Sequence, residues 1–168
     1  MSKSHFKVIV FLIICIVLYL IIYPFYIRWI AGNYAKEFAY VLNSHDMKKY
    51  DKFFSEDTVF ELNDRQIKYA DAKENMKKVQ AFTSKGSYGH LEEEYDFWEL
   101  IMNVYVKKEY TVSLMLPVWD YRVGEHIITV GIIEGEMILK RKAIFFYDIE
   151  QVTFYDDREG FIEDFIGI

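Results

Sequence analysis

The side chains that could carry out chemistry are few in this chain and lie far apart in the sequence. His45, His90 and His126 do not have the short, regular spacing of a metal-binding set. The only cysteine is Cys15, which lies inside a long apolar run, so disulfides, zinc clusters and cysteine nucleophiles are excluded from the rest of the chain. A Ser-His-Asp set stays open on sequence distance alone, but no nucleophile-elbow pattern is present. We therefore expect no metal and no cofactor, and we assign no catalytic residue from these groups.

A basic triplet, Lys140-Arg141-Lys142, interrupts an otherwise apolar segment of strand character. On a strand, Lys140 and Lys142 share one face, whereas Arg141 points to the other. The favoured interpretation is a solvated outer face that keeps the sheet from aggregating. The alternative is that Lys140 and Lys142 contact an acidic partner, such as residues 92–94 of a second copy.

The C-terminal tail, residues 156–168, interleaves acidic and apolar residues. Its acidic residues lack the ligand spacing of a calcium loop. Its bulky apolar residues are Phe161, Ile162, Phe165 and Ile166. Either these side chains dock on the folded domain, or the tail is a short segment that a partner binds.

The composition predicts one folded domain besides a membrane anchor. The chain has 168 residues, of which 18% are aromatic, so a substantial core can form. Residues 1–28 contain Lys3, Lys7 and Arg28 but no acid, which leaves 17 basic and 26 acidic residues for the remainder. Because an acidic domain is repelled by phosphate backbones, we do not expect nucleic acid as a partner. The excess of Lys over Arg and the frequent Ile indicate an AT-rich bacterial genome.

Residues 8–27 form an apolar run that is long enough to cross a membrane, because ~20 helical residues span ~30 Å of hydrocarbon. Aromatic residues crowd its C-terminal end, as in an interfacial belt: Tyr19, Tyr23, Tyr26 and Trp29. A cleaved signal peptide is the alternative, but no Ala-x-Ala precedes a suitable cleavage point. A lipoprotein is disfavoured because Ile14, before Cys15, is not small. We predict an uncleaved, single transmembrane helix over residues 8–27.

The basic residues at the N-terminus favour an orientation with that end inside the cell. Residues 1–7 would then be a cytoplasmic head, and residues 31–168 an extracytoplasmic domain on the cell membrane. No Gly, Ser or Pro linker separates the run from the domain, so we expect the first helix to continue directly from the membrane.

The first half of the domain has the pattern of helices. Apolar residues at helical spacing predict a helix that ends near Leu42, followed by a polar corner at residues 43–46 and a short helix over residues 47–54. A strand starts near Thr58, and a third helix is predicted from an Asp71 N-cap through Phe82. The predicted core residues that join helices to sheet are Phe38, Phe53, Phe54 and Phe60.

The second half has the pattern of strands. We predict strands over residues 95–107, 109–119, 126–133, 136–147 and 151–155, with short connections that include Glu134-Gly135. Helices followed by adjacent antiparallel strands indicate an α+β fold, in which a curved sheet wraps around the helices.

These segments resemble a known family. Leu42-Asn43-Ser44-His45-Asp46, Phe53-Phe54 and Asp57-Thr58-Val59-Phe60 are similar to the opening of the SnoaL-like branch of the nuclear-transport-factor-2-like (NTF2-like) superfamily. The element order is similar over residues 33–156. The resemblance implies a cone-shaped domain of three helices packed on a curved antiparallel sheet, with an open cavity and frequently a homodimer through the sheet. It implies no single activity, because this fold serves unrelated functions.

The resemblance also raises one candidate for catalysis. In ketosteroid-isomerase-like members a carboxylate at the end of the first strand enters the cavity as general base, and Glu61 falls near that place. A carboxylate in an apolar cone would have a raised pKa suited to proton abstraction. No second group that would stabilise the product is recognisable, so we favour a solvated glutamate.

Two functions therefore stay open. The first is a bitopic membrane protein whose outer domain binds a protein partner or a small ligand, as a subunit of an envelope, secretion or conjugation assembly. The second is a membrane-tethered isomerase- or cyclase-like enzyme that uses Glu61. We favour the first, because no convergent set of acid, base and oxyanion donors is present.

Overall fold

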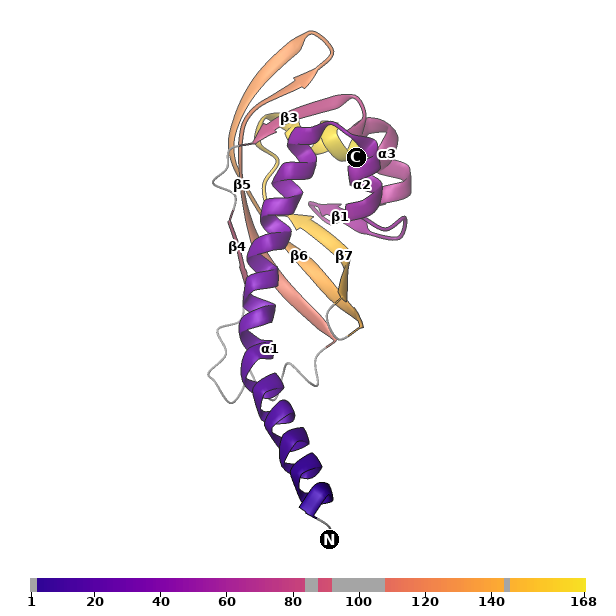
Figure 1. Cartoon of the computed structure of the whole chain (residues 1–168). Helices are drawn as coiled ribbons and strands as arrows, with labels where there is room; N and C mark the ends of the chain where they lie inside the picture. Colours follow the sequence, from indigo (N-terminus) through magenta and orange to yellow (C-terminus); the bar gives the residue numbers. More distant parts are fainter. Residues whose placement is uncertain (1–2, 84–87, 92–107, 144–145) are drawn as a thin grey trace.

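The computed structural model describes residues 3–83, 88–91, 108–143 and 146–168. The predicted strand over residues 95–107 and the acidic residues 92–94 lie outside these ranges. The described residues form an α+β fold with an apolar N-terminal helix, as predicted (Figure 1).

Helix α1 runs unbroken over Lys3–Ser44 and has two different halves (Figure 1). From Phe6 to Ile22 its bulky apolar residues are exposed or half-buried, and of these Tyr19 packs against the edge of the core. From Tyr23 onward one side of the helix is buried against the domain, through residues at helical spacing: Tyr23, Ile27, Ile30, Ala31, Ala35, Phe38 and Leu42. As expected, no linker separates the halves.

The polar corner and the short second helix are where the sequence predicts them. His45 adopts a positive φ of 50°, which ends α1. The Asp46 carboxylate accepts a hydrogen bond of 3.0 Å from the Lys48 backbone N–H, and this N-cap starts α2, Met47–Phe53.

Helix α3, Tyr69–Met76, is shorter than predicted and begins two residues earlier. Asp71 lies in its first turn and is not its N-cap, because the Tyr69 backbone N–H bonds to the Thr58 carbonyl oxygen and fixes the start there. The predicted continuation through Phe82 is wrong. Residues Val79–Thr83 form strand β3, which pairs with β5.

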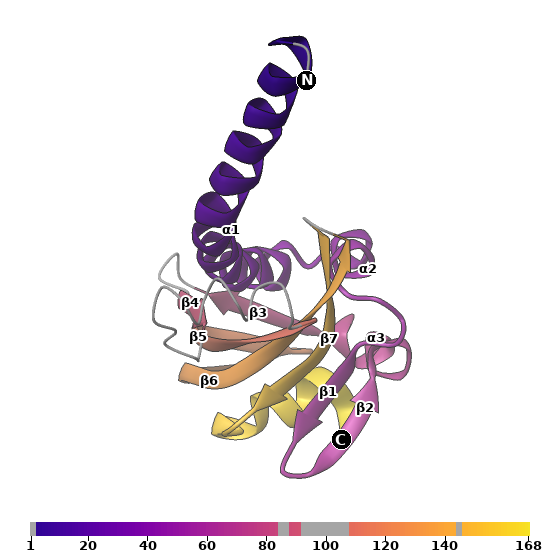
Figure 2. The same ribbon diagram turned by 90° about the horizontal axis from the view of Figure 1, so that it is seen from below.

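A seven-stranded sheet in the order β2-β1-β7-β6-β5-β3, with β4 also paired to β5, curls around the helices (Figure 2). Its strands are β1 (Val59–Leu62), β2 (Arg65–Lys68), β3, β4 (Tyr88–Leu91), β5 (Glu109–Val123), β6 (His126–Ala143) and β7 (Phe146–Phe154). The prediction of an antiparallel sheet fails at one pair, because β1 runs parallel to β7, with Phe60 opposite Val152. These strands lie far apart in the chain, so no hairpin forces them to be antiparallel.

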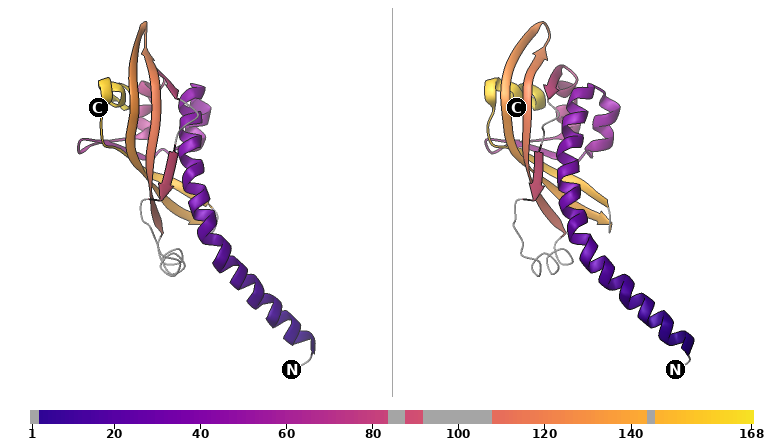
Figure 3. Two further views of the ribbon diagram at one scale, coloured as in Figure 1. Left: turned by 90° about the vertical axis from the view of Figure 1, so that its left-hand side faces the viewer. Right: turned by 60° about the vertical axis from the view of Figure 1, so that its left-hand side comes forward.

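Strands β5 and β6 make one long hairpin that extends past the rest of the sheet (Figure 3). The predicted break at Glu134-Gly135 is wrong, since β6 runs through it without a turn. A Cβ atom on Gly135 would lie 2.3 Å from the Thr153 carbonyl oxygen. Gly135 is therefore required for the close approach of β7 and not for a turn.

Aromatic rings fill the space between helices and sheet. Phe38, Phe54 and Phe60 are buried as predicted, and the Phe54 ring contacts both others edge-on. Phe53 is only half-buried, and it contacts Phe38 and Tyr34 at the edge of this core.

Candidate functional site

The C-terminal tail fills the interior of the domain. Phe161, Ile162, Phe165 and Ile166 are each at most 2% exposed. The Phe161 ring contacts the Tyr121 ring on β5, and the Phe165 ring contacts the Tyr50 ring on α2. Of the two alternatives for the tail, docking on its own domain is confirmed. The resemblance to NTF2-like proteins implies an open cavity, but these side chains occupy the interior.

Polar contacts hold the first part of the tail, residues 157–164. The Asp157 carboxylate accepts hydrogen bonds from the backbone N–H groups of Ile162 (2.6 Å) and Glu163 (3.3 Å), and burial raises the pKa of this carboxyl. The Tyr121 hydroxyl donates to the Glu159 carbonyl oxygen at 2.9 Å. Burial, and then the Asp164 carboxylate, raise the pKa of Tyr121 to about 12, so its hydroxyl stays protonated at neutral pH.

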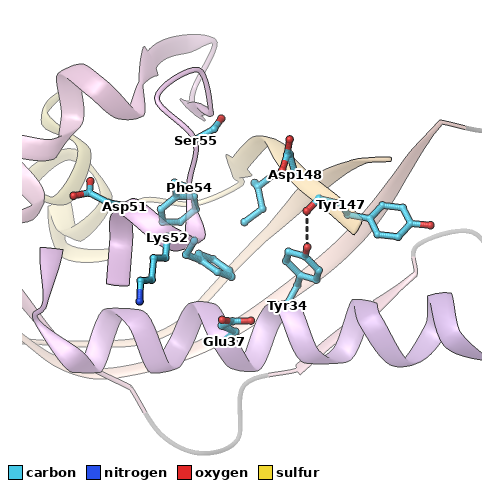
Figure 4. A pocket seen from close by; sticks show the side chains of 10 residues that line it. Tyr34, Glu37, Asp51, Lys52, Phe54, Ser55, Tyr147 and Asp148 are labelled. Carbon is cyan, nitrogen blue, oxygen red and sulfur yellow. Dashed lines mark hydrogen bonds between the residues drawn. The ribbon is translucent and has the colours of Figure 1, made fainter. Parts of the chain in front are cut away.

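A recess of about 380 Å³ opens between α1, α2 and β7 (Figure 4). Helix α1 contributes Tyr34 and Glu37, and β7 contributes Tyr147 and Asp148. The Tyr34 hydroxyl donates a hydrogen bond of 2.7 Å to the Tyr147 carbonyl oxygen, which closes one side. The remaining lining residues come from α2, from the two residues that follow it and from β7: Asp51, Lys52, Phe53, Phe54, Ser55 and Ile149.

Acidic groups dominate this recess, but two of its three carboxylates already have partners. Asp51 bonds to the Lys73 ammonium and accepts from the Tyr69 hydroxyl at 2.8 Å, and these bonds lower its pKa. Asp148 pairs with Lys142 at 3.0 Å. Burial, followed by Glu37 and Asp148, raises the pKa of Tyr34 to about 12, so the phenol is not a base at neutral pH. The recess can hold a small polar or cationic group, but it brings no nucleophile and base together.

Glu61, the candidate general base, lies on β1 with its carboxylate on the outer side of the sheet. Its neighbours Phe60 and Leu62 point into the core, so strand alternation sends Glu61 to the opposite face. There the carboxylate accepts hydrogen bonds from the side-chain amides of Gln66 and Gln151, the latter at 3.1 Å. Glu61 is thus placed on the face opposite Phe60 and Leu62, and its role as a general base stays a prediction.

Lys140 and Lys142, the candidate partner contacts, are exposed but paired within their own chain. Lys140 lies between Glu109 and Glu150, and Lys142 bonds to Asp148. These ion pairs agree with the interpretation of a solvated face. A contact with an acidic partner stays a prediction.

The histidines are not brought together at a site. His45 is the residue that ends α1, and burial lowers its pKa. His126 is exposed at the start of β6, and His90 belongs to β4. Over the described ranges, no group of three or more His, Cys, Asp or Glu side chains could hold a metal ion.

The outer face of the β5–β6 hairpin exposes apolar residues. Met115 and Ile132 are each 46% exposed. Ile132 is opposite Pro117, which is two residues after Met115 on β5, so the two side chains lie near each other on the same face. Trp119 and Ile127, farther along the hairpin, are more exposed still. A sequence signal for this surface exists, because Met115 and Pro117 occupy the otherwise polar face of β5.

Among the residues that the structure describes, one helix, α1, is apolar and long enough to cross a membrane. No family model and no curated protein matches the chain.

Solved structures of similar fold are found. An NTF2-like protein from Cytophaga hutchinsonii is 9% identical, with a TM-score of 0.48 over 73% of this chain and 92% of that chain. A putative polyketide cyclase from Pseudomonas putida is 13% identical, with a TM-score of 0.45 over 82% and 96%. An NTF2-like protein of unknown function from Exiguobacterium is 14% identical, with a TM-score of 0.39 over 72% and 96%. Similarities of this size carry no argument about activity or partner.

Proposed function

We propose that this chain is a bitopic membrane protein whose extracytoplasmic domain binds a protein partner, as a subunit of an envelope assembly. Residues 8–27 cross the cell membrane once, with the N-terminus inside. The domain that follows uses the outer face of the β5–β6 hairpin as its contact surface, with Met115 and Ile132 at its centre.

The observation that carries this proposal is the contrast between the inside and the outside of the domain. The domain's own tail packs in the interior, where Phe161 and Phe165 are buried, so these side chains take up space that a substrate would need. The outer face exposes Met115, Trp119 and Ile132 on a two-stranded platform. Exposed apolar residues gathered on one face are typical of protein contact sites.

The enzyme alternative has Glu61 as its candidate base, and the position of Glu61 does not favour it. Glu61 lies on the outer face and is held by two glutamine amides, away from the residues that line the recess. A general base also needs a second group to stabilise the charge that develops, and the groups bonded to Glu61 are the side-chain amides of Gln66 and Gln151. Accordingly, Glu61→Gln should leave the cellular phenotype of the gene intact.

The topology is tested first. Protease added to intact protoplasts should digest the domain from residue 31 onward. A domain that is protected until the membrane is opened would reverse the orientation. An amino terminus found near Asn33 would instead show that the run is a cleaved signal.

The contact surface is tested with a photo-crosslinking amino acid at Ile132 in living cells. Tyr40 on α1, which is 59% exposed, provides the matched control position on another surface. We expect a crosslinked product from position 132 and none from position 40. A product with the mass of two copies assigns the face to a homodimer, and a different mass identifies another protein. Equal or absent crosslinking at both positions would contradict the proposal.

A further inference from the structure

The apolar run and the folded domain overlap along α1. The run predicted to cross the membrane covers residues 8–27, yet Tyr23 and Ile27 are buried against the domain, at 1% and 2% exposure. The domain therefore covers one side of the last five residues of the run, while the other side stays free, since Phe25 is 61% exposed. The overlap sets how close the domain lies to the hydrocarbon.

The length of the run leaves little freedom in this geometry. A span of ~20 residues that ended at Ile22 would place both Lys3 and Lys7 within the hydrocarbon, which is costly for charged side chains. A span of the same length that begins after Lys7 ends at residue 27 and therefore includes Tyr23. In either case Tyr23 lies within about one helical turn of the outer boundary of the hydrocarbon, and so does whatever packs against it.

The end of the β6–β7 hairpin packs against Tyr23. The Tyr147 hydroxyl lies 2.6 Å from the Tyr23 hydroxyl, and the Arg141 side chain also hydrogen-bonds Tyr23. Figure 1 shows this end of the sheet beside the middle of α1, where the helix leaves the domain. The hairpin end is therefore held at the depth where the apolar run reaches the membrane surface.

The residues at this end suit a lipid interface. Phe146 precedes Tyr147 and is 68% exposed, more than any other bulky apolar residue of the described chain. The Lys142 side chain is 70% exposed. Lys108 is exposed alongside, where its carbonyl oxygen accepts a hydrogen bond from the Arg141 backbone N–H at 2.7 Å. An exposed aromatic ring flanked by lysines is the composition of residues that sit among lipid headgroups.

We propose that this end of the sheet, the membrane tip (Lys108, Arg141, Lys142 and Phe146), docks on the anionic headgroup surface of the membrane that α1 crosses. Phe146 inserts at the headgroup level, and the exposed Lys108 and Lys142 side chains contact lipid phosphates, whereas Arg141 stays bonded to Tyr23. The inference rests on the proposed function only in that α1 spans the membrane. Through this second contact the domain cannot rotate freely on its helix, and the β5–β6 face is presented in a fixed direction.

The position of the tip favours lipid over a protein partner. The bond between the Tyr147 and Tyr23 hydroxyls holds the tip beside the run, and so close to the surface of the bilayer that α1 crosses. The opposite end of the same sheet provides an internal comparison. Ile127 is 59% exposed near the far turn of the β5–β6 hairpin, away from the N-terminal half of α1 (Figure 3).

The experiment uses full-length protein in vesicles and a polarity-sensitive fluorophore on a single cysteine. Cys15, in the middle of the run, is the only native cysteine, so labelling it reports whether α1 is inserted. Phe146→Cys and Ile127→Cys are made separately in a Cys15→Ser background. Each is labelled and reconstituted in vesicles of phosphatidylcholine with phosphatidylglycerol, with or without lipids that carry a spin-label quencher at headgroup depth.

We expect the label at position 146 to emit at shorter wavelength than the label at position 127, and to lose fluorescence when the quencher is present. The label at position 127 should keep its fluorescence. Equal behaviour at 146 and 127, with Cys15 still quenched by a deep spin label, would overturn the docking while leaving the anchor intact. Loss of quenching at Cys15 itself would instead contradict the transmembrane helix on which both proposals rest.

A charge variant separates attraction to anionic lipid from mere proximity. Lys142→Glu in the Phe146→Cys background should reduce quenching at position 146 in vesicles with phosphatidylglycerol. Lys78→Glu, which changes the same charge on the loop after α3, is the matched control and should leave it unchanged. Equal quenching in both variants would contradict a role for the basic side chains of the tip.

Discussion

The Tyr23 and Tyr147 hydroxyl oxygens lie 2.6 Å apart, so the outer end of the apolar run is hydrogen-bonded to the start of β7. Two phenols that are 124 residues apart thus join the helix to the sheet. Since α1 has no linker, this bond and the packing around it decide whether the run and the domain behave as one rigid unit.

The first prediction is that these two hydroxyls are energetically coupled. Tyr23→Phe or Tyr147→Phe should each lower the free energy of unfolding by about 1 kcal/mol, because each leaves a buried hydroxyl without this partner. The double variant should lose less than the sum of the two, with a coupling of about 0.5–1.5 kcal/mol. Thermal unfolding of the full chain in detergent measures all four proteins. Strictly additive losses would show that the bond does not stabilise the joint.

A second prediction concerns the small residues where α1 meets β4. A Cβ atom on Gly89 would lie 2.6 Å from the Ala35 Cβ and 2.9 Å from the Ala31 carbonyl oxygen. Gly89→Ala should therefore force α1 away from the sheet, at a cost of about 1–3 kcal/mol. Gly32→Ala is the control, because its Cβ would meet only the Gly89 carbonyl oxygen at 3.6 Å. It should be neutral or stabilising, since Ala favours a helix by about 1 kcal/mol over Gly. Similar melting temperatures for the two variants would mean that the helix is not packed on Gly89.

Local signals were sufficient to predict the end of α1, the polar corner and α2. The polar corner at residues 43–46 and the apolar stripe of α2 act within a few residues, so the sequence predicted them at the right places. Gly135 was misinterpreted because its role is a close approach to Thr153, a contact that no local pattern records. The parallel pairing of β1 with β7 was missed for the same reason. The α+β class followed from the order of the elements.

The candidate recess could not be predicted from sequence. Tyr34, Asp51 and Tyr147 line it together, but they come from three elements and share no motif. Glu61 shows a different limit of local patterns. Its position after Asp57 suggested a catalytic place by resemblance, but the side of the strand on which it lies depends on Phe60 and Leu62 entering the core.

A third prediction is that Asp51 contributes to stability at neutral pH and loses this contribution in acid. Its pKa is lowered in the folded state by Lys73 and Tyr69, so the folded protein binds the proton less readily than the unfolded chain. Such a group stabilises the fold above its unfolded pKa, near 3.9, and the stabilisation disappears as the pH falls through the lower folded value. Asp51→Asn should therefore lower the melting temperature at pH 7. Below about pH 4, the melting temperatures of the variant and the wild type should differ less.

Asp64→Asn provides the control for this measurement, because Asp64 is exposed in the turn between β1 and β2. It removes one carboxylate without touching the contacts of Asp51. Melting curves from pH 7 to pH 3 should separate the two variants at the neutral end. If Asp51→Asn follows Asp64→Asn at every pH, the bonds to Lys73 and Tyr69 do not contribute.

The last prediction is that the tail is part of the core of the domain. Phe165 is fully buried and its ring contacts Tyr50 and Phe161, so Phe165→Ala should cost about 3–5 kcal/mol of unfolding free energy. Ile127→Ala, at an exposed position, should change stability by no more than about 0.5 kcal/mol. The truncation should also leave an apolar cavity, because surrounding side chains relax only in part. A small apolar ligand such as benzene should then raise the melting temperature of the variant but not that of wild type. A Phe165→Ala protein with unchanged stability and no response to benzene would mean that the tail is free to leave the interior, and that the cavity expected from the family resemblance is open after all.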